Sequence, residues 1–447
     1  MINAIILAAG KGTRMKTDLP KCAFPILEKP MINYIIDALN KTKVDKKIVV
    51  VGYKKEVFYD LLKGTDVSFA EQVNQLGTAD AVKAALNSID DDGISLIIPG
   101  DTPLINYEKI NSLIEIELTL KKDIALLTTI LDNPTGYGRI IREDGKIVRI
   151  AEENDAYSDE KQIKEVNTGI MVLKNSFLKE AIHKIKNNNS KKEYYLTDIV
   201  NFTGEITSII LDHNEILYGI NDLYTLSVVE NMVRENILKK HTMNGVNIIN
   251  ANTVTIYPDV VIEDGVTIYP NSFIRGNTII KKGAVIGPNT ELCNATILES
   301  AKVKHSVVYD STIGQFATVG PFAHIRMNAV VGPNNRIGNF VEVKNSVLGD
   351  TTKASHLSYL GDSTIGENVN IGCGSITVNY DGRKKHRTVI GNNVFVGCNS
   401  NLIAPVEIKD NAFIAAGSTI TQDVDEYDLA IARNRQTNKK GYAKKYR

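Results

Sequence analysis

Aliphatic residues that recur every six positions dominate the second half of the chain and restrict its possible folds more than any other feature. The repeat occupies four stretches, which run from Ile256 to Leu298, from Val307 to Val343, across Ile365 and Ile371, and from Ile390 to Ile420. A period of six fits neither an α-helix nor an alternating strand, and it is typical of a parallel β-helix built from hexapeptides. We therefore predict a rod of triangular coils, in which each of three short sides points one aliphatic residue inward.

Such a rod is filled by its own side chains. Strands stack about 4.8 Å apart, so about nine coils would form a rod ~43 Å long. Each coil buries its aliphatic residues only against the neighbouring coils, and we interpret these residues as structural. Because the interior is full, we expect ligands to bind in grooves on the outside of the rod or between rods.

Composition restricts the possible partners and location. The 447 residues exceed one ordinary core, which favours two or three domains. The 52 basic residues (Lys+Arg) balance 52 acidic residues (Asp+Glu), so charge gives no reason to expect nucleic acid or a membrane surface as partner. No apolar run approaches the ~20 residues that span a bilayer, and no secretory leader is recognisable. The four cysteines lack the spacing of a metal site or disulfide framework, and we expect a cytoplasmic protein.

The first half of the chain lacks the six-residue period. Short apolar runs at 5–7, 47–51 and 96–98 are typical of strands buried on both faces, and they alternate with amphipathic stretches at 30–39 and 79–89. This alternation predicts an open α/β sheet with right-handed crossovers.

Residues 223–243 carry apolar residues at helical spacing opposite a charged face, which predicts a helix between two domains. We therefore expect a sheet domain over residues 1–225, a linking helix over 226–247, and a β-helix with a basic C-terminal tail over 248–447.

A glycine-rich loop follows the first predicted strand. In an open sheet, ligands bind where strands end, and glycines there let backbone N–H groups approach phosphates, while Lys11, Arg14 and Lys21 add positive charge. The loop is not a dinucleotide fingerprint, because Met15 replaces the last glycine, and it is not a Walker loop. For the glycines alone, a plain tight turn is the alternative.

The longer pattern from Gly10 to Lys21, Gly-x-Gly-Thr-Arg-Met-x-Thr-x-x-Pro-Lys, resembles the sugar-nucleotide pyrophosphorylases, which couple a nucleoside triphosphate to a sugar 1-phosphate. Residues 72–78 offer amide and hydroxyl groups to a nucleobase. Asp101 ends a buried apolar run with a carboxylate suited to Mg²⁺, which prefers oxygen ligands and accompanies phosphates. A turn-forming aspartate before Pro103 is the alternative.

Two features interrupt the regularity of the second half. An insertion at 379–386 separates Ile371 from Ile390, and a segment that projects from a regular rod should lie over a neighbouring chain or a ligand, with a neutral corner loop as the alternative. Before it, His356 stands among hydroxyl-bearing residues, and histidine is the natural base near neutral pH. A structural histidine is the alternative there.

The second half also carries a series of polar residues in a fixed order, namely Arg326, the run 339–344, His356, Tyr359, Asn370, Asn379 with Tyr380, Ala416 and Arg433. With the first-half motifs, the chain resembles over nearly its whole length the bifunctional bacterial N-acetylglucosamine-1-phosphate uridylyltransferases/glucosamine-1-phosphate acetyltransferases. The resemblance implies an α/β nucleotide-binding sheet domain followed by a left-handed parallel β-helix of hexapeptide repeats. The chain departs from the family pattern at Met327, where proline is usual, and at Cys373 and Cys398, where alanine and serine are frequent.

The resemblance implies that the β-helix half transfers an acetyl group from acetyl-CoA to the amine of glucosamine 1-phosphate. An ammonium group has no lone pair, so a base must remove its proton, and His356 is the candidate, supported by Glu342. The implied glucosamine-1-phosphate site comprises Arg326, Lys344, Tyr359 and Asn370. The implied acetyl-CoA site comprises Cys373, Asn379, Tyr380, Cys398, Ala416 and Arg433. An acyl-cysteine intermediate at Cys398 is the alternative to direct transfer. Because a rod offers only outer grooves, we expect a homotrimer with sites between neighbours.

The same resemblance implies that the first half joins N-acetylglucosamine 1-phosphate to UTP, which gives UDP-N-acetylglucosamine and pyrophosphate. The attacking phosphate oxygen is already anionic, so the task is to hold two anions together, and cations perform it. Mg²⁺ would be held by Asp101 and Asn221. The implied UTP and UDP-N-acetylglucosamine site comprises Leu7, Ala8, Ala9, Gly10, Arg14, Lys21, Gln72, Gly77, Thr78, Pro99, Gly100, Asp101, Gly138, Glu152, Asn167 and Asn221.

Two other functions are compatible with parts of the sequence. The first is a single-activity sugar-nucleotide pyrophosphorylase whose β-helix only regulates or trimerises, and the surroundings of His356 and the insertion argue against it. The second is a trimerisation scaffold with an inactive first half, and the complete set of charged phosphate-site residues argues against that. No nucleic-acid partner and no membrane span are expected.

Overall fold

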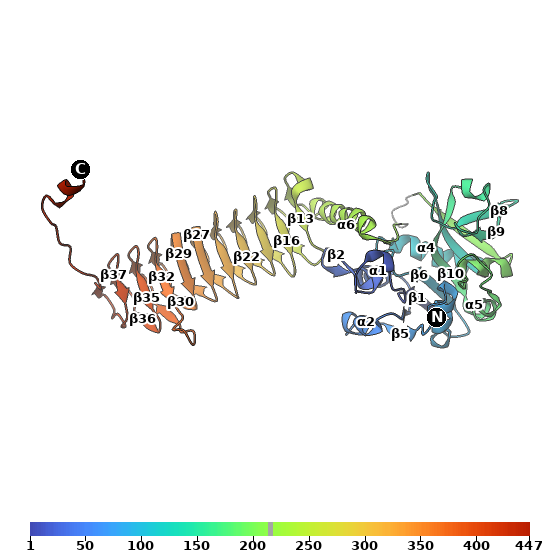
Figure 1. Cartoon of the computed structure of the whole chain (residues 1–447), viewed down its shortest axis with the longest axis horizontal. Coiled ribbons are helices and arrows are strands. Elements are labelled where there is room, and N and C mark those ends of the chain that lie inside the picture. Colours follow the sequence, from blue (N-terminus) through green and yellow to red (C-terminus); the bar gives the residue numbers. More distant parts are fainter. Residues whose placement is uncertain (213–217) are drawn as a thin grey trace. The chain divides into compact units, whose positions relative to one another are not determined.

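The computed structural model describes residues 1–212 and 218–447. Its contacts divide the chain into two compact units, Met1–Val233 and Arg234–Arg447. Helix α6 (Leu223–Met243) covers the stretch whose apolar spacing predicts a helix, and the division between the units falls within it (Figure 1). Among the described residues, no helix is both long enough and apolar enough to cross a membrane.

The first unit is built around a nine-stranded mixed sheet with the order β11-β7-β10-β6-β1-β4-β5, to which β8 adds through β10 and β9 through β8. The strands are β1 (Ile2–Leu7), β4 (Lys46–Val51), β5 (Ser68–Glu71), β6 (Ile94–Pro99), β7 (Ile124–Ile130), β8 (Arg139–Glu143), β9 (Lys146–Ala151), β10 (Glu165–Lys174) and β11 (Ile206–Leu211). The predicted strands are β1, β4 and β6, which lie side by side and parallel. Strand β10 runs antiparallel to β6 and β7, which makes the sheet mixed.

Besides the start of α6, the described residues of the first unit form helices α1 to α5. They are α1 (Met31–Leu39), α2 (Lys55–Leu61), α3 (Thr78–Ala85), α4 (Tyr107–Leu120) and α5 (Asn175–Ala181). A small ribbon joins β2 (Pro25–Ile26) to β3 (Lys29–Pro30). The described residues of this unit also form short 3₁₀ turns at η1 (Thr13–Met15), η2 (Lys21–Ala23), η3 (Leu86–Ser88), η4 (Glu160–Gln162), η5 (Ile182–Lys184) and η6 (Leu196–Phe202), and those of the second unit form η8 (Ala251–Thr253) and η9 (Tyr442–Tyr446).

Both faces of the sheet are buried. Along β1, Ala4 and Ile6 join one apolar core with residues of α1 and α4, whereas Ile5 joins a second core with residues of α3 and α5. Successive side chains of a strand point to opposite faces, so a strand covered on both sides must be apolar throughout. This explains the unbroken apolar runs in the sequence and leaves the strand ends as the place for polar groups.

The second unit is a left-handed parallel β-helix of hexapeptide repeats (Figure 1). One side is a nine-stranded sheet, in agreement with about nine predicted coils, made of β14 (Val261–Ile262), β17 (Ile279–Ile280), β20 (Thr296–Ile297), β23 (Thr312–Ile313), β26 (Val330–Val331), β28 (Val347–Leu348), β30 (Ser363–Ile365), β33 (Thr388–Ile390) and β36 (Val406–Ile408).

The other two sides together form a nineteen-stranded sheet, because some of its strands continue around a corner. Its strands are β12 (Asn247–Ile248), β13 (Thr255–Ile256), β15 (Thr267–Ile268), β16 (Phe273–Arg275), β18 (Val285–Ile286), β19 (Glu291–Cys293), β21 (Lys302–Val303), β22 (Val307–Tyr309), β24 (Thr318–Val319), β25 (His324–Arg326), β27 (Arg336–Lys344), β29 (Lys353–Gly361), β31 (Asn370–Ile371), β32 (Ile376–Val378), β34 (Phe395–Val396), β35 (Asn401–Ile403), β37 (Phe413–Ile414), β38 (Thr419–Ile420) and β39 (Leu429–Ala430).

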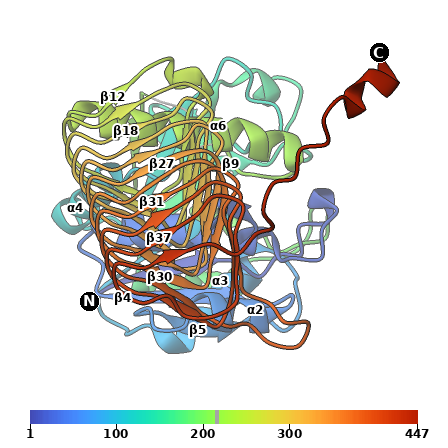
Figure 2. The same cartoon turned by 90° about the vertical axis from the view of Figure 1, so that its left-hand side faces the viewer.

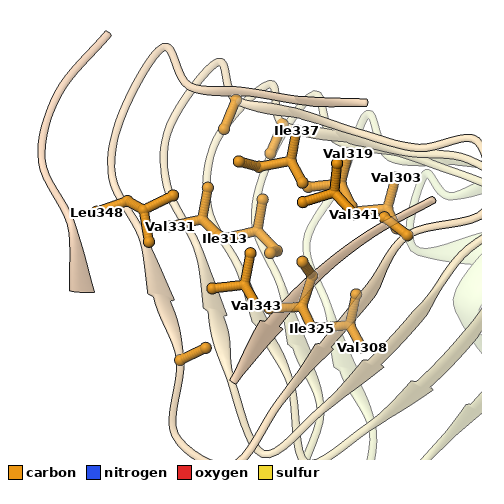
Figure 3. Close-up of a cluster of buried hydrophobic side chains, with 14 of the residues drawn as sticks. Val303, Val308, Ile313, Val319, Ile325, Val331, Ile337, Val341, Val343 and Leu348 are labelled. Carbon is orange, nitrogen blue, oxygen red and sulfur yellow. The ribbon is translucent and has the colours of Figure 1, made fainter. Parts of the chain in front are cut away.

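Stacked aliphatic side chains fill the interior of the β-helix. Figure 3 shows three columns, one from each side, which register as Val303–Val319–Ile337, Ile313–Val331–Leu348 and Val308–Ile325–Val343. All nine of these side chains are at most 2% exposed. The predicted filled rod is therefore confirmed, and functional groups have to lie on its outer surface.

The inward phase differs from the prediction at two positions. Ile297 and Val308 point into the core, whereas the predicted Leu298 and Val307 are only partly buried. Strand pairing gives the reason, because Leu292 stacks on Val308, so this coil has 16 residues instead of the 18 that separate Ile274 from Leu292. One residue is missing at each of two corners, and each omission shifts the period by one.

Two segments leave the regular coils of the second unit. Figure 2, a view along the stacked coils, shows one coil behind another and the C-terminal tail departing from them. All residues from Ile431 to Arg447 are exposed. The insertion at 379–386 turns back on itself through a bridge between Tyr380 and Lys385.

Candidate functional site

A pocket of about 400 Å³ opens in the first unit at the carboxyl ends of the parallel strands. It is lined by Leu7, Ala9, Gly10, Lys21, Cys22, Gln72, Gln75, Gly77, Thr78, Ala81, Pro99, Asp101, Glu152, Asn167, Gly169, Met171, Glu193, Leu196 and Thr197. Strand ends of an open sheet are the usual ligand site of this fold, because loops from neighbouring strands meet there. Most of the residues expected from the sequence to bind nucleotide lie in this lining.

The other expected residues border the pocket or lie behind it. The Ala8 side chain packs in the core on the opposite sheet face. The backbone N–H of Gly100 donates to the Leu7 carbonyl at 2.9 Å, and the carbonyl of Gly138 accepts from Asn167 N–H at 2.8 Å. Gly100 and Gly138 thus fix the backbone of lining residues.

A cluster of charged and polar side chains forms the phosphate end of the site. The Lys21 ammonium group forms an ion pair with Asp101 and donates to Asn221 Oδ1 at 2.8 Å. Arg14 donates to the same Asn221 oxygen at 2.9 Å. The structure therefore brings together four residues that are separated by up to about two hundred positions in the sequence and combines two cations with a carboxylate.

The same cluster fits the magnesium site expected from the sequence. Asp101 and Asn221 each direct one side-chain oxygen, a possible metal ligand, toward the point where the Lys21 ammonium lies. Among the described residues, no group of three or more His, Cys, Asp or Glu side chains could hold a metal alone. Mg²⁺ is usually held by one or two protein oxygens together with phosphates and water, and this donor set matches that pattern.

The loop that leads into α3 is fixed for contact with a planar polar group. The Gln72 amide donates to Asp80 at 2.8 Å and to the Gly77 carbonyl at 3.1 Å, which orients its side chain. Gly77 has a φ of 125°, and a Cβ there would collide with the Tyr194 backbone. Only glycine fits this position, because the 72–78 loop is held directly against the Tyr194 backbone.

The opposite wall contains a carboxyl group in an unusual environment. Glu152 accepts a hydrogen bond from Thr197 Oγ1 at 2.8 Å. Burial raises the pKa of Glu152, and the Thr197 hydrogen bond opposes this shift. Burial and the Asp101 charge also raise the pKa of Cys22 to about 12, so its thiol stays neutral.

Sequence reasoning missed Thr197, Glu193 and Leu196, which also line the pocket. They come from a segment without a recognisable motif. Their only signal is spatial, because Tyr194 N–H donates to Leu76 at 2.8 Å and thereby docks this segment on the predicted nucleobase loop.

A second candidate site follows one corner of the β-helix. On each coil, one residue lies just before a corner residue that has a left-handed backbone conformation or is glycine. These residues stack on one another along successive coils, and they are Asn339, His356, Cys373, Cys398 and Ala416. The side chain of Arg433 passes next to Gly417, the corner residue that follows Ala416. One outer ridge thus joins the expected base to four of the six residues expected to bind acetyl-CoA.

His356 is exposed on this ridge, and its ring orientation is fixed. Its Nδ1 lies 2.7 Å from Asn339 Oδ1. With the amide oxygen as acceptor, Nδ1 donates, and in the neutral ring the lone pair then lies on Nε2. This is the tautomer that a general base needs.

Glu342 does not contact His356 as the sequence suggests. Its carboxylate instead pairs with the Arg326 guanidinium at 2.6 Å, because the strand register places Glu342 opposite Tyr359 and Asn339 opposite His356. Asn339 is thus the hydrogen-bond partner of His356, and Glu342 holds Arg326.

A buried polar cluster lies near the carboxyl ends of β27 and β29, on the side of the β-helix that follows the corner at His356. Lys344 pairs with Asp362 at 2.9 Å, and both side chains are less than 10% exposed. Asn379 donates to the same carboxylate at 2.5 Å and to Tyr359 Oη at 3.2 Å. Burial acts to raise the pKa of Asp362, but hydrogen bonds from Asn345 and Lys344 hold it below its ordinary value.

Lys385 is a cation of this cluster that sequence reasoning missed. Its amine contacts the Lys344 amine, which lowers the pKa of Lys385. Arg326 adds a third positive charge nearby. Asp362 balances Lys344 and Glu342 balances Arg326, so Lys385 leaves this cluster with one positive charge in excess, and an excess cation favours an anionic group such as phosphate.

The insertion holds Lys385 in place through Asp381. The Asp381 carboxylate accepts from Arg383 N–H at 2.7 Å, from Lys384 N–H at 2.8 Å and from His386 Nε2 at 2.7 Å. These contacts, led by the Lys384 backbone, lower the pKa of Asp381 to about 2. The exposed loop is therefore ordered as a turn, and Lys385 is directed toward Lys344.

The two remaining expected residues are Asn370 and Tyr380. Asn370 is partly buried on the side that leads to Cys373, and it pairs in register with Lys353 and Phe395. Tyr380 is 58% exposed at the start of the insertion.

A strand-end pocket on an α/β sheet and a ridge of polar residues on a hexapeptide rod define a nucleotidyl transferase joined to a hexapeptide transferase. Comparison of the sequence with known families agrees. It matches Nucleotidyl transferase over residues 3–206, the GMPPB C-terminal domain over 256–332 and Bacterial transferase hexapeptide (six repeats) over 387–422.

Individual relatives identify the family more narrowly. A protein named Bifunctional protein GlmU from Acholeplasma laidlawii is 51% identical over 446 residues, which cover 99% of this chain and 97% of that protein. Proteins of the same name from Exiguobacterium sp. and Geobacillus sp. are 47% and 45% identical and cover 99% and 98% of this chain and 99% and 97% of their own lengths. The chain belongs to the bifunctional GlmU family.

Proposed function

We propose that this protein makes UDP-N-acetylglucosamine in two steps at two sites. At the β-helix ridge it transfers an acetyl group from acetyl-CoA to glucosamine 1-phosphate. At the α/β pocket it then joins N-acetylglucosamine 1-phosphate to UTP and releases pyrophosphate. Family membership over the whole chain and the presence of two separate sites support this function.

In the acetyl-transfer step, His356 Nε2 takes a proton from the substrate ammonium group. The freed amine attacks the thioester carbonyl and the carbon–sulfur bond breaks. The new amide nitrogen gives its second proton to the departing thiolate, so CoA leaves as the thiol. The hydrogen bond to Asn339 supports this role, since in the neutral ring it places the lone pair on Nε2. Arg326, Lys344 and Lys385 bind the sugar phosphate, and Tyr359 and Asn370 position the sugar.

Acetyl-CoA lies along the corner ridge in this proposal. Cys373, Cys398 and Ala416 follow His356 on successive coils, and Arg433 flanks the far end. Asn379 and Tyr380 complete the site from the insertion. An extended cofactor placed along this ridge brings its thioester to the coil of His356, which favours direct transfer over an acyl-cysteine.

In the uridylyl-transfer step, a phosphate oxygen of N-acetylglucosamine 1-phosphate attacks the α-phosphorus of UTP, and pyrophosphate leaves. Lys21 and Arg14 neutralise the phosphates. Asp101 and Asn221 would hold Mg²⁺, which supplies further positive charge at the phosphates. Gln72, Gly77 and Thr78 bind uracil, and Gly138, Glu152 and Asn167 bind the sugar.

We further propose a homotrimer in the cytoplasm. A filled rod presents His356 only on its outer corner, so a neighbouring copy is needed to enclose the substrates. The proposed division into a uridylyltransferase domain over 1–225, a linking helix over 226–247 and an acetyltransferase domain over 248–447 assigns one activity to each end.

The fixed tautomer of the exposed His356 is the observation that carries the second activity, and a two-part assay tests it. Purified protein is given glucosamine 1-phosphate and acetyl-CoA, and free CoA thiol is followed. Separately, it is given N-acetylglucosamine 1-phosphate, UTP and Mg²⁺, and pyrophosphate is followed. Turnover in both assays is expected, whereas pyrophosphate release without CoA release would leave a single-activity pyrophosphorylase.

A further inference from the structure

Two cysteines occupy equivalent positions on adjacent coils of the β-helix. Strand pairing aligns Ile371 with Val396 before the corner and Ile376 with Asn401 after it, both with an offset of 25 residues. Asn399 N–H donates to the Cys373 carbonyl at 2.8 Å across the same corner. The register therefore places Cys373 directly over Cys398.

Adjacent coils bring these two residues within the range of a disulfide. Stacked strands lie about 4.8 Å apart. The Cα atoms of disulfide-bonded cysteines are usually ~4.4–6.8 Å apart. Both side chains leave the same corner in the same direction, since each precedes a left-handed corner residue, Gly374 and Asn399.

The two thiols are also accessible. Cys398 is exposed and Cys373 partly buried, whereas Cys22 is buried in the first unit. No group of described residues here has the geometry of a metal site, so a structural metal does not account for the pair. Their position between His356 and Ala416 places them in the wall of the proposed acetyl-CoA site.

We propose that Cys373 and Cys398 form a reversible oxidative modification site that closes the acetyl-CoA ridge. The oxidant is a hydroperoxide. One thiolate, with Cys398 as the more exposed candidate, attacks the peroxide oxygen, which gives a sulfenic acid and releases water or an alcohol. The second thiol then attacks that sulfur, a disulfide forms, and water leaves.

A closed disulfide changes the ridge where the cofactor thioester has to lie. It ties the two corner side chains to each other across the ridge. The loss of acetyl transfer rests on the proposed function of this ridge, whereas formation of the disulfide does not. A thiol reductant restores both cysteines, so the inhibition is reversible.

The test uses the full-length protein treated with hydrogen peroxide. We expect intact mass to fall by two hydrogen atoms and digestion to yield a peptide that links Cys373 to Cys398. Acetyl transfer should fall by about tenfold or more and return after dithiothreitol. Uridylyl transfer should not change, and saturating acetyl-CoA should slow the modification.

Matched variants separate this pair from other thiols. Cys373→Ala and Cys398→Ser should each lose the peroxide sensitivity when oxidised and reduced samples of the same variant are compared, whereas Cys293→Ser should keep it. The proposal is overturned if no linked peptide forms or if the Cys373→Ala variant is inactivated reversibly to the same extent. Absence of acetyl transfer in the fully reduced protein would instead count against the proposed function, because the mass measurement still reports on the thiols.

Discussion

The two sites differ in how much of their surroundings one chain provides. The α/β unit builds a pocket of about 400 Å³ from loops that meet at strand ends. The β-helix places His356 on an exposed outer corner of a rod whose interior is filled by stacked aliphatic side chains. A sheet with loops can surround a substrate alone, whereas a filled rod can only line it along an outer surface.

The two proposed phosphate sites also differ in how their charged side chains are paired before ligand binds. In the pocket, Lys21 already pairs with Asp101, so bound phosphates and a metal must replace an internal ion pair. On the rod, Lys344 pairs with Asp362, but Lys385 remains beside Lys344 as an excess cation. In the α/β pocket, Lys21 and Asp101 change their ion-pair partners when phosphates and the metal bind. On the β-helix, the excess positive charge of Lys385 is balanced only when an anion binds.

Removal of the Asp101 carboxylate should have the largest effect. Asp101→Ala should abolish Mg²⁺-dependent pyrophosphate release, because it removes the only charged oxygen ligand of the proposed metal site. Acetyl transfer should be unchanged. Pyrophosphate release should be followed across a Mg²⁺ titration, and retained activity at ordinary Mg²⁺ would refute the metal assignment.

Removal of the His356 imidazole should affect only the acetyl-transfer site on the β-helix. His356→Ala should slow acetyl transfer by about 10²–10⁴-fold, or ~3–5 kcal/mol, as expected for a general base. Uridylyl transfer serves as the internal control. Asn339→Ala should give a smaller decrease, because the ring stays but its tautomer is no longer fixed, and an unchanged rate in that variant would contradict the tautomer argument.

A core substitution tests which of two neighbouring aliphatic residues of the β-helix points inward. Ile297→Ala should destabilise the β-helix by about 2–5 kcal/mol, because it opens a cavity in a stacked column. The matched change Leu298→Ala should cost much less, since Leu298 is only partly buried. Chemical denaturation followed by both activities measures this, and equal costs would contradict the observed inward phase.

The smallest predicted effect concerns the excess cation. Lys385→Ala should raise KM for glucosamine 1-phosphate by about tenfold, which corresponds to ~1.4 kcal/mol, with little change in kcat. Lys384→Ala is the control, because it lies on the same exposed loop but does not contact Lys344. Steady-state kinetics with varied glucosamine 1-phosphate decide, and a similar KM for the two variants would remove Lys385 from the phosphate site.

The sequence allowed the fold to be predicted where periodicity is strong. The hexapeptide repeat predicted the rod, and unbroken apolar runs predicted β1, β4 and β6. The local phase failed at Ile297 and Val308 because each has an aliphatic neighbour, so the pattern cannot decide which one points inward. The antiparallel direction of β10 was also not predictable, since burial on both faces looks the same in either direction.

Site residues were predictable where they belong to a motif, and less so where only the register brings them together. Lys21 and Asp101 stand in recognisable patterns, and the structure places them in contact. The hydrogen-bond partner of His356, Asn339, depends on the pairing between β27 and β29, which no motif in the sequence reveals. Lys385 stands in a run of five basic residues, and only the turn at Asp381 distinguishes it from the others.

Mixing two variants tests most directly whether one chain carries two independent sites. His356→Ala and Asp101→Ala are each given glucosamine 1-phosphate, acetyl-CoA, UTP and Mg²⁺, and UDP-N-acetylglucosamine is measured. Each variant alone should form little product, and the mixture should restore synthesis, because N-acetylglucosamine 1-phosphate released by the Asp101→Ala protein can be used by the His356→Ala protein. Failure of the mixture, with both variants folded, would contradict the assignment of one activity to each site.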